Sequence, residues 1–294
     1  MTVKPYQADF LLLLVAISWG TTFLLVQKAV DTVPVTTFLL WRFGWAFALM
    51  LPIAWSRRRH LDRPTLGAAA LLGLFNFGAY ALQTYGLTLT LSSSVAFITG
   101  LFVVMVPFLG WILFGQKASR PVWIAGLVAA AGLWLLTMQG ELRAGWGEVY
   151  TLGCAVLFSL HLIYTGRFAR RYDIVLLVTF QFGTMALGSA LLSILRGESL
   201  LLPHWGGSVA VALVITVLFA TMFAFWVQTS MQRFTTASRA ALIFTMEPLS
   251  AAVFGHLYGG EVLSGLQMLG GGLIVAAMLV AELATVAPQK TQGT

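Results

Sequence analysis

Residues 9–28 read DFLLLLVAISWGTTFLLVQK, and residues 148–167 read EVYTLGCAVLFSLHLIYTGR. The two stretches align at a spacing of 139 positions, and similar residues occupy the start, the middle and the end of both: Asp9 and Glu148, Trp19 and Phe158, Lys28 and Arg167. About 20 apolar residues are needed for a helix to cross the ~30 Å hydrocarbon core of a bilayer. The two stretches therefore predict a membrane protein in which one helical unit occurs twice.

Eight more apolar runs of similar length fill the rest of the chain and complete two sets of five. The ten runs cover 9–28, 35–55, 65–86, 94–114, 121–138, 148–166, 174–195, 207–229, 239–258 and 263–283. The composition agrees, because 59% of the residues are hydrophobic, 9% are charged and the mean hydropathy is +0.88. The runs are continuously apolar and lack the alternation of membrane β-strands, so we predict an all-α membrane protein.

Because five is an odd number, the two sets must cross the membrane in opposite directions. We therefore expect ten transmembrane helices arranged as two inverted five-helix repeats. This is the architecture of secondary transporters, in which the two halves enclose a site near the bilayer midplane. We place the first repeat at residues 8–140, the second repeat at 147–284 and a short cytoplasmic tail at 285–294. In the later spans the spacing between matching residues widens to 144 or 145.

The Lys and Arg residues are sorted between the two sides of the membrane. If the N-terminus is cytoplasmic, thirteen of them lie on the cytoplasmic side, and only Lys28, Arg143 and Arg196 lie on the other. This positive-inside bias predicts that both termini are cytoplasmic. The net charge of +7 is therefore explained by membrane topology, which makes lipid the expected partner and not nucleic acid. The one cysteine, Cys154, cannot form an intramolecular disulfide.

Several short motifs stand out in the two repeats. They are Ser18-Trp19-Gly20-Thr21-Thr22-Phe23, Trp41-Arg42-Phe43, Pro107 and Gly115-Gln116-Lys117 in the first, and Thr236-Ala237-Ser238-Arg239-Ala240-Ala241, Glu247-Pro248 and Gly259-Gly260-Glu261 in the second. On these motifs the chain resembles the EamA family of the drug/metabolite transporter superfamily over about residues 8–284, and more narrowly a YddG-type amino-acid exporter. Gln116-Lys117 departs from the Gly-Glu that relatives often carry. The resemblance implies a multi-pass protein of the bacterial inner membrane.

Ionisable residues inside a membrane are functional candidates, because an unpaired charge there costs at least ~2.5–3.5 kcal/mol. Glu247 could bind a substrate ammonium group or take up a proton during transport, or it could be a hydrogen-bonded carboxyl group that fixes helix packing. Arg42 better fits a packing role. His161 is the second candidate for proton coupling, although a single buried histidine is more often only hydrogen-bonded.

The resemblance implies that spans one, three, four, six, eight and nine line a central cavity. The expected substrate contacts combine aromatic faces with hydrogen-bonding groups, and they are Trp19, Thr22, Phe23, Asn76, Tyr80, Gln83, Thr99, Phe102, Phe158, His161, Trp226 and Glu247. An amphiphilic molecule such as an amino acid fits this lining. For most aromatic residues of the chain, contact with lipid is the alternative. Pro107 and Pro248 are expected to kink spans four and nine.

The sequence contains no catalytic constellation: it has no His-Glu-x-x-His pair, no Gly-x-Ser-x-Gly elbow, no Walker A loop and no close carboxylate pair within a span. We therefore predict no enzyme, no catalytic residue, no metal and no cofactor. The expected function is export of amino acids, aromatic or other apolar ones among them, or of related small metabolites by alternating access. A translocase for a lipid-linked carrier, or for a different metabolite, is the alternative on the same fold. An intramembrane enzyme is disfavoured. The exact substrate, the direction of net flux, proton coupling or passive exchange, and monomer or dimer stay open.

Overall fold

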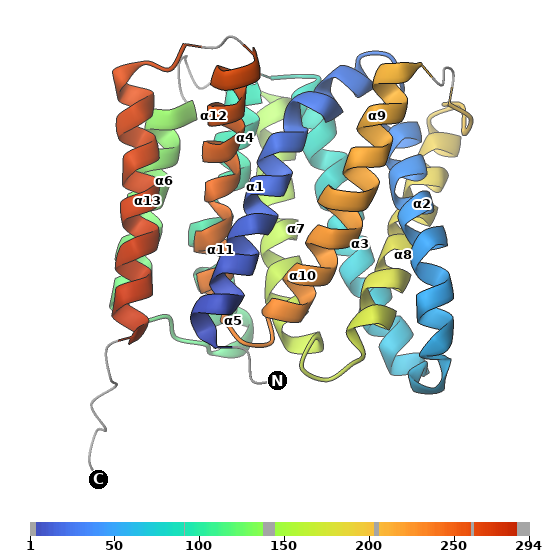
Figure 1. Ribbon diagram of the computed structural model, residues 1–294, viewed down its shortest axis with the longest axis horizontal. Coiled ribbons are helices and arrows are strands. Elements are labelled where there is room, and N and C mark those ends of the chain that lie inside the picture. The colour runs from blue at the N-terminus through green and yellow to red at the C-terminus, as the bar shows by residue number, and fades with distance from the viewer. Residues whose placement is uncertain (1–3, 91, 138–144, 203–205, 260–261, 287–294) are drawn as a thin grey trace.

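The computed structural model describes residues 4–90, 92–137, 145–202, 206–259 and 262–286, and every regular element in these ranges is a helix (Figure 1). In chain order the elements are α1 (Pro5–Val30), α2 (Val35–Ser56), η1 (Arg58–His60), α3 (Arg63–Leu87), α4 (Ser92–Gly100), α5 (Phe102–Phe114), α6 (Arg120–Thr137), α7 (Trp146–Phe168), α8 (Ile174–Leu195), α9 (Gly207–Ile215), η2 (Thr216–Phe223), α10 (Ala224–Met231), α11 (Ala237–Phe244), α12 (Met246–Gly259) and α13 (Gly265–Val286).

Each of the ten predicted spans coincides with one helix or with a run of consecutive helical segments. Among the described residues, eight such segments are long and apolar enough to cross a membrane, the first at Val35–Ser56 and the last at Ala237–Tyr258, and Gly265–Val280 is a shorter apolar helix. The remaining span corresponds to α1. The prediction of an all-α membrane protein is confirmed.

The two halves of the chain run in opposite directions through the bundle. We call the face where α1 begins and α13 ends the terminal face; α7, the equivalent of α1, begins on the opposite face (Figure 1). Some contacts between the halves join equivalent spans, since α6 packs on α13 and α2 packs on α8; others join non-equivalent spans, since α3 packs on α7 and α1 packs on α12. Where α6 meets α13, a Cβ atom on Gly132 would lie 2.7 Å from the Gly270 carbonyl oxygen. Only glycine permits this close approach of the two backbones.

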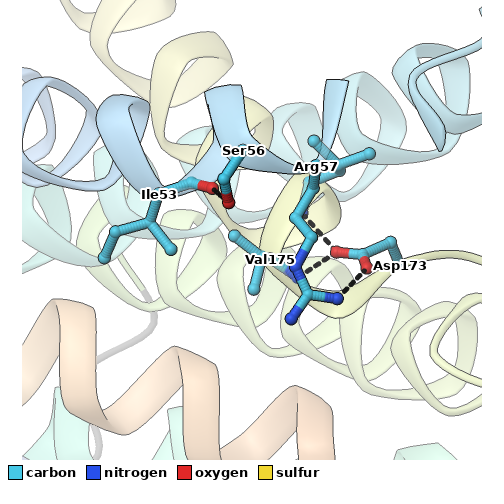
Figure 2. Close-up of polar contacts among 6 residues, drawn as sticks. Ile53, Ser56, Arg57, Asp173 and Val175 are labelled. Atoms are coloured by element: carbon cyan, nitrogen blue, oxygen red, sulfur yellow. Dashed lines mark hydrogen bonds and ion pairs between the residues drawn. The ribbon is translucent and has the colours of Figure 1, made fainter. Parts of the chain in front are cut away.

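Helices α2 and α8 are joined at both ends. On the terminal face, Arg57 forms an ion pair of 3.4 Å with Asp173, and Asp173 also caps α8 by accepting a hydrogen bond of 2.9 Å from the backbone N–H of Val175 (Figure 2). On the opposite face, the hydroxyl group of Thr37 donates to the carbonyl oxygen of Ser199 at 2.6 Å. The two helices therefore form one continuous wall of the bundle.

Two of the predicted spans are interrupted at equivalent positions. Span four divides at Leu101 and span nine divides at Thr245, which are 144 residues apart. Pro107 lies inside α5, downstream of the first break, and Pro248 lies in the first turn of α12, where the missing N–H costs little. The two helix breaks therefore lie at equivalent positions of the two repeats, whereas the two prolines do not. Kinks at the prolines themselves stay predictions.

Span eight contains a π-helical segment, η2, between α9 and α10. Its apolar sequence gave no sign of this departure from α-helical geometry. The corresponding span of the first repeat, α3, is one continuous α-helix. A π-helix is uncommon and often occurs at a functional site. In this protein η2 lies beside the cavity between the two halves.

Candidate functional site

A cavity of about 480 Å³ lies between the two halves of the chain. Helices α1 to α5 contribute one part of its wall, and α7 and α10 to α12 contribute the other. Its mouth is formed by residues at the ends of α1 to α3 on the opposite face, namely Val30, Asp31, Val35, Thr88 and Thr90. Asp31 and Thr88 are exposed. The cavity therefore opens toward the opposite face.

The cavity is closed toward the terminal face. Its walls include Phe102, Leu162 and Phe244, which also belong to a buried apolar cluster with residues of α1, α10 and α11. Nearer the terminal face, Nη2 of Arg239 lies 2.5 Å from Oδ2 of Asp9, and the two side chains are only 13% and 10% exposed. This ion pair joins α11 of the second half to α1 of the first, so it closes the bundle below the cavity.

Ten of the predicted substrate contacts line this cavity: Trp19, Thr22, Asn76, Tyr80, Gln83, Thr99, Phe102, Phe158, His161 and Glu247. The prediction that Trp226 contacts the substrate is wrong, because Trp226 is 49% exposed and does not line the cavity. The preceding residue, Phe225, takes that place. One step along a helix turns a side chain by about 100°, and the rotation of span eight depends on η2. The side chain of Phe23 lies outside the described part of the structure.

Arg42 contributes a buried guanidinium group to the cavity wall and is 3% exposed. Its Nε donates to the hydroxyl oxygen of Thr221 at 2.7 Å, and its Nη2 donates to the carbonyl oxygen of Ala220 at 3.2 Å. The guanidinium carbon lies 5.3 Å from the ring centroids of both Phe43 and Tyr80. Two hydrogen bonds and two cation–π contacts hold the charge in place. Because Arg42 lines the cavity, the same charge is presented to a ligand.

Glu247 contributes a carboxylate to the same cavity from α12. This carboxylate forms no hydrogen bond and no ion pair with another side chain in the part of the chain that the structure describes, Arg42 included. The backbone at Glu247 is positioned by close packing on α1, because a Cβ atom on Gly20 would lie 2.5 Å from its carbonyl oxygen. Ser250 donates to that carbonyl oxygen at 2.9 Å. The carboxylate therefore faces the cavity from a tightly fixed backbone.

His161 lies within a buried polar cluster at the cavity wall and is 2% exposed. Its Nε2 lies 3.0 Å from Nδ2 of Asn76, 3.3 Å from Oε1 of Gln181 and 3.2 Å from the hydroxyl oxygen of Thr165. The other ends of the two amides, Oδ1 of Asn76 and Nε2 of Gln181, are buried without a hydrogen-bond partner in the described structure. Buried polar atoms are normally paired, so this cluster has unused hydrogen-bonding capacity beside the cavity.

Aromatic rings fill the wall between these polar groups. Trp19 packs edge-on against Phe244, with ring centroids 5.1 Å apart, and its Nε1 donates to the carbonyl oxygen of Ala220 at 2.9 Å. Tyr80 packs edge-on against Phe158 at 5.5 Å. The Ala220 carbonyl of η2 therefore accepts hydrogen bonds from both Trp19 and Arg42, which ties the first half of the chain to the π-helical segment of the second.

Sequence reasoning missed some of these contacts. Phe225 and Phe244 line the cavity. The sequence does not distinguish them from the many other apolar residues of the same spans. The sequence favours a packing role for Arg42, although its position inside a span also indicates a binding group. Among the described residues, no group of three or more His, Cys, Asp and Glu side chains is suited to hold a metal ion.

These features define the class of the protein. Two inverted helical halves enclose a cavity of ligand size, which opens to one face and is closed to the other, as in a membrane transporter. The sequence profile of the EamA-like transporter family matches the chain twice, over residues 7–138 and 145–282. The chain therefore belongs to the EamA-like transporter family.

Relatives agree with this class. An "uncharacterized transporter" of Archaeoglobus fulgidus is 29% identical over 96% of this chain and 87% of its own length. The "uncharacterized inner membrane transporter YedA" of Escherichia coli is 27% identical over 91% of this chain and 88% of its own. A solved structure entitled "Crystal structure of protein" aligns with a TM-score of 0.77 and 22% identity over 94% of this chain and 98% of its own, which shows the shared fold. The narrower likeness to YddG-type exporters stays a prediction.

Proposed function

We propose that this transporter exports amino acids, aromatic or other apolar ones among them, by alternating access. The observation that carries the proposal is the pair of opposite charges on the cavity wall, Arg42 and Glu247, which do not pair with each other. A zwitterion placed between them satisfies both, with its carboxylate at the guanidinium group and its ammonium group at the carboxylate. The surrounding aromatic rings suit an apolar side chain.

The orientation of the cavity in the membrane rests on the sorting of basic residues. The positive-inside bias assigns the terminal face to the cytoplasm of a bacterial inner membrane, with both termini on that side. The cavity then opens outward, and the ion pair of Asp9 and Arg239 closes the cytoplasmic side. An exporter must also adopt the reverse state, in which α1 and α11 separate on the cytoplasmic side. The relative YedA is itself named an inner membrane transporter.

Glu247 is the first candidate for proton coupling and His161 is the second. A carboxyl group that faces a substrate cavity without a protein partner can exchange a proton or a substrate ammonium group. Both uses need the carboxylate oxygen atoms, whereas the amide of Gln has the same shape and cannot take up a proton. Replacing Glu247 with Gln therefore separates the two roles from a role in packing.

The test is uptake of labelled amino acids into liposomes that contain the purified protein, with and without a pH gradient. We expect saturable uptake of particular amino acids by the wild type. If Glu247→Gln loses only the gradient-dependent part, Glu247 carries the proton; if it loses uptake in both conditions, Glu247 binds the substrate. Thr179→Val is the matched control, because Thr179 is buried outside the cavity. Folded wild-type protein that transports no amino acid contradicts the proposal and favours a lipid-linked carrier or another metabolite.

A further inference from the structure

The contacts of Nε2 of His161 require conflicting hydrogen-bonding roles. This nitrogen carries either a proton or a lone pair, so it cannot both accept from Nδ2 of Asn76 and donate to Oε1 of Gln181. Both amides can form a hydrogen bond with Nε2 only if one of them turns its second atom toward the ring. Those second atoms, Oδ1 of Asn76 and Nε2 of Gln181, are the ones left without a partner in the described structure.

Turning one amide resolves the conflict in either direction. If Asn76 turns, Nε2 of His161 carries the proton and faces two carbonyl oxygen atoms. If Gln181 turns, Nε2 carries the lone pair and faces two amide groups. The two ends of an amide have nearly the same shape, so each arrangement fits the same space. The cluster therefore supports both neutral forms of the imidazole ring.

The second ring nitrogen, Nδ1, is the one available to a ligand. All three polar contacts of the ring are made by Nε2, and Nδ1 has no hydrogen bond to another residue within the described ranges. His161 lines the cavity. Nδ1 is an acceptor when Nε2 carries the proton and a donor when it does not. Nδ1 of His161 can therefore accept a hydrogen bond from a donor group of the ligand or donate one to an acceptor group.

Helix α3 connects this cluster to the charged part of the cavity. Asn76, beside His161, and Tyr80, beside Arg42, are one turn apart on α3, which separates them by about 6 Å along the helix axis and places them on the same face. A zwitterion held at Arg42 can thus extend its side chain along α3 toward His161. The distance is comparable to the length of a large amino-acid side chain.

We propose that His161 determines side-chain specificity: it forms a hydrogen bond with the polar end of the substrate side chain and so favours amino acids such as tyrosine and glutamine over apolar ones of similar size. This inference rests on the proposed amino-acid transport, and it adds that preferred substrates carry a polar group at the end of the side chain. A substrate without the polar group leaves the cluster's hydrogen-bonding capacity unused, and a site built to bind a polar group discriminates against analogues that lack it.

The experiment compares two matched pairs, tyrosine with phenylalanine and glutamine with methionine, as unlabelled competitors of labelled phenylalanine uptake in proteoliposomes. In the wild type we expect the polar member of each pair to compete at about fivefold lower concentration or better, since an unsatisfied buried hydrogen bond costs about 1 kcal/mol or more. In His161→Leu both ratios should fall to about one. His161→Gln, which keeps a polar end, should retain part of the preference. Thr179→Val should retain all of it.

Several outcomes would overturn the inference. Ratios that stay unchanged in His161→Leu, or a uniform loss of affinity for all four amino acids, would show that His161 only supports the fold. If His161→Leu does not fold, His161→Gln decides the matter in the same way, because unchanged ratios there reject the proposal. Failure of the wild type to transport any of the four is a different result, since it rejects amino-acid transport itself.

Discussion

Nε of Arg42 donates a hydrogen bond of 2.7 Å to the hydroxyl oxygen of Thr221. The two residues are 179 positions apart, and both are buried. Arg42 belongs to α2 of the first half, and Thr221 belongs to η2 of the second. The same side chain donates to the carbonyl oxygen of Ala220. A residue that better fitted a packing role in the sequence therefore joins the two halves of the transporter at the wall of its cavity.

This relationship predicts that Thr221→Val weakens the fold without changing the charge of the cavity. Valine matches the shape of threonine but leaves Nε of Arg42 without its acceptor, which costs about 1–3 kcal/mol for a buried donor. The melting temperature of the purified protein should fall. Arg42→Gln should lower it as well and should also weaken substrate binding, because it removes the guanidinium charge. Equal affinities in Arg42→Gln and the wild type would show that Arg42 does not contact the substrate.

Gly20→Ala should separate α1 from α12. A Cβ atom at position 20 would lie 2.2 Å from Oγ of Ser250 and 2.5 Å from the Glu247 carbonyl oxygen, so the helices must move apart. Such overpacking costs about 1–3 kcal/mol, and it displaces Glu247 from the cavity wall. We expect a lower melting temperature and a loss of transport.

The double variant Gly20→Ala, Ser250→Ala should recover only part of that loss, since the backbone oxygen of Glu247 remains in the way. Gly44→Ala is the control, because a Cβ atom there has no neighbour within 4 Å. A neutral effect of Gly20→Ala on both measurements would show that α1 and α12 have room to spare.

The repeat predicts which residues close the mouth of the cavity in the reverse state. On the closed terminal face, Nη2 of Arg170 donates to the carbonyl oxygen of Thr235 at 3.4 Å. The equivalent residues in the first repeat are Asp31, at a spacing of 139, and Thr90, at a spacing of 145, and both line the open mouth. Because inverted repeats exchange their arrangements between the two states, Asp31 should approach Thr90 when the terminal face opens.

Cross-linking tests this exchange in a Cys154→Ala background, which removes the one native cysteine, itself buried. Asp31→Cys and Thr90→Cys should form a disulfide more readily once Asp9→Asn breaks the ion pair with Arg239. Breaking a largely buried pair costs about 3–5 kcal/mol, which shifts a two-state equilibrium by roughly a hundredfold to a few thousandfold. Cross-linking that is insensitive to Asp9→Asn would reject this assignment of the gate.

Asp62 should make the stability of α3 depend on pH. Its side chain caps the helix by accepting from the backbone N–H of Thr65 at 2.8 Å, and hydrogen bonds from Thr65 lower the pKa of Asp62 below its usual value. The cap therefore contributes stability above the pKa of an unfolded aspartate, about 3.9, and loses it as the pH falls through the lower folded value.

Asp62→Ala should accordingly lower the melting temperature at neutral pH, and its difference from the wild type should shrink in acid. Asp62→Asn keeps a neutral cap, so its melting temperature relative to Asp62→Ala should not vary in this range. A constant difference between Asp62→Ala and the wild type at all pH values would show that the ionised carboxylate does not contribute.

Much of the site could be predicted because polar residues inside apolar spans are few. Glu247, Asn76 and His161 stand out in the sequence for this reason, and all three line the cavity. The position of Trp226 outside the cavity could not be predicted in this way. One aromatic residue among many does not indicate which side of its helix faces the cavity. The π-helical segment that sets the rotation of span eight has no sequence signal of its own.

The sequence alone determined the helical class, the number of spans and their inversion, because these depend on the length of each apolar run and on whether the number of runs per repeat is odd. Only the tertiary structure decided that Arg42 is held by η2, that Asp9 pairs with Arg239 and that Phe225 replaces Trp226 in the cavity wall. These depend on how each helix is rotated and which neighbour it meets, and packing across the whole bundle fixes both.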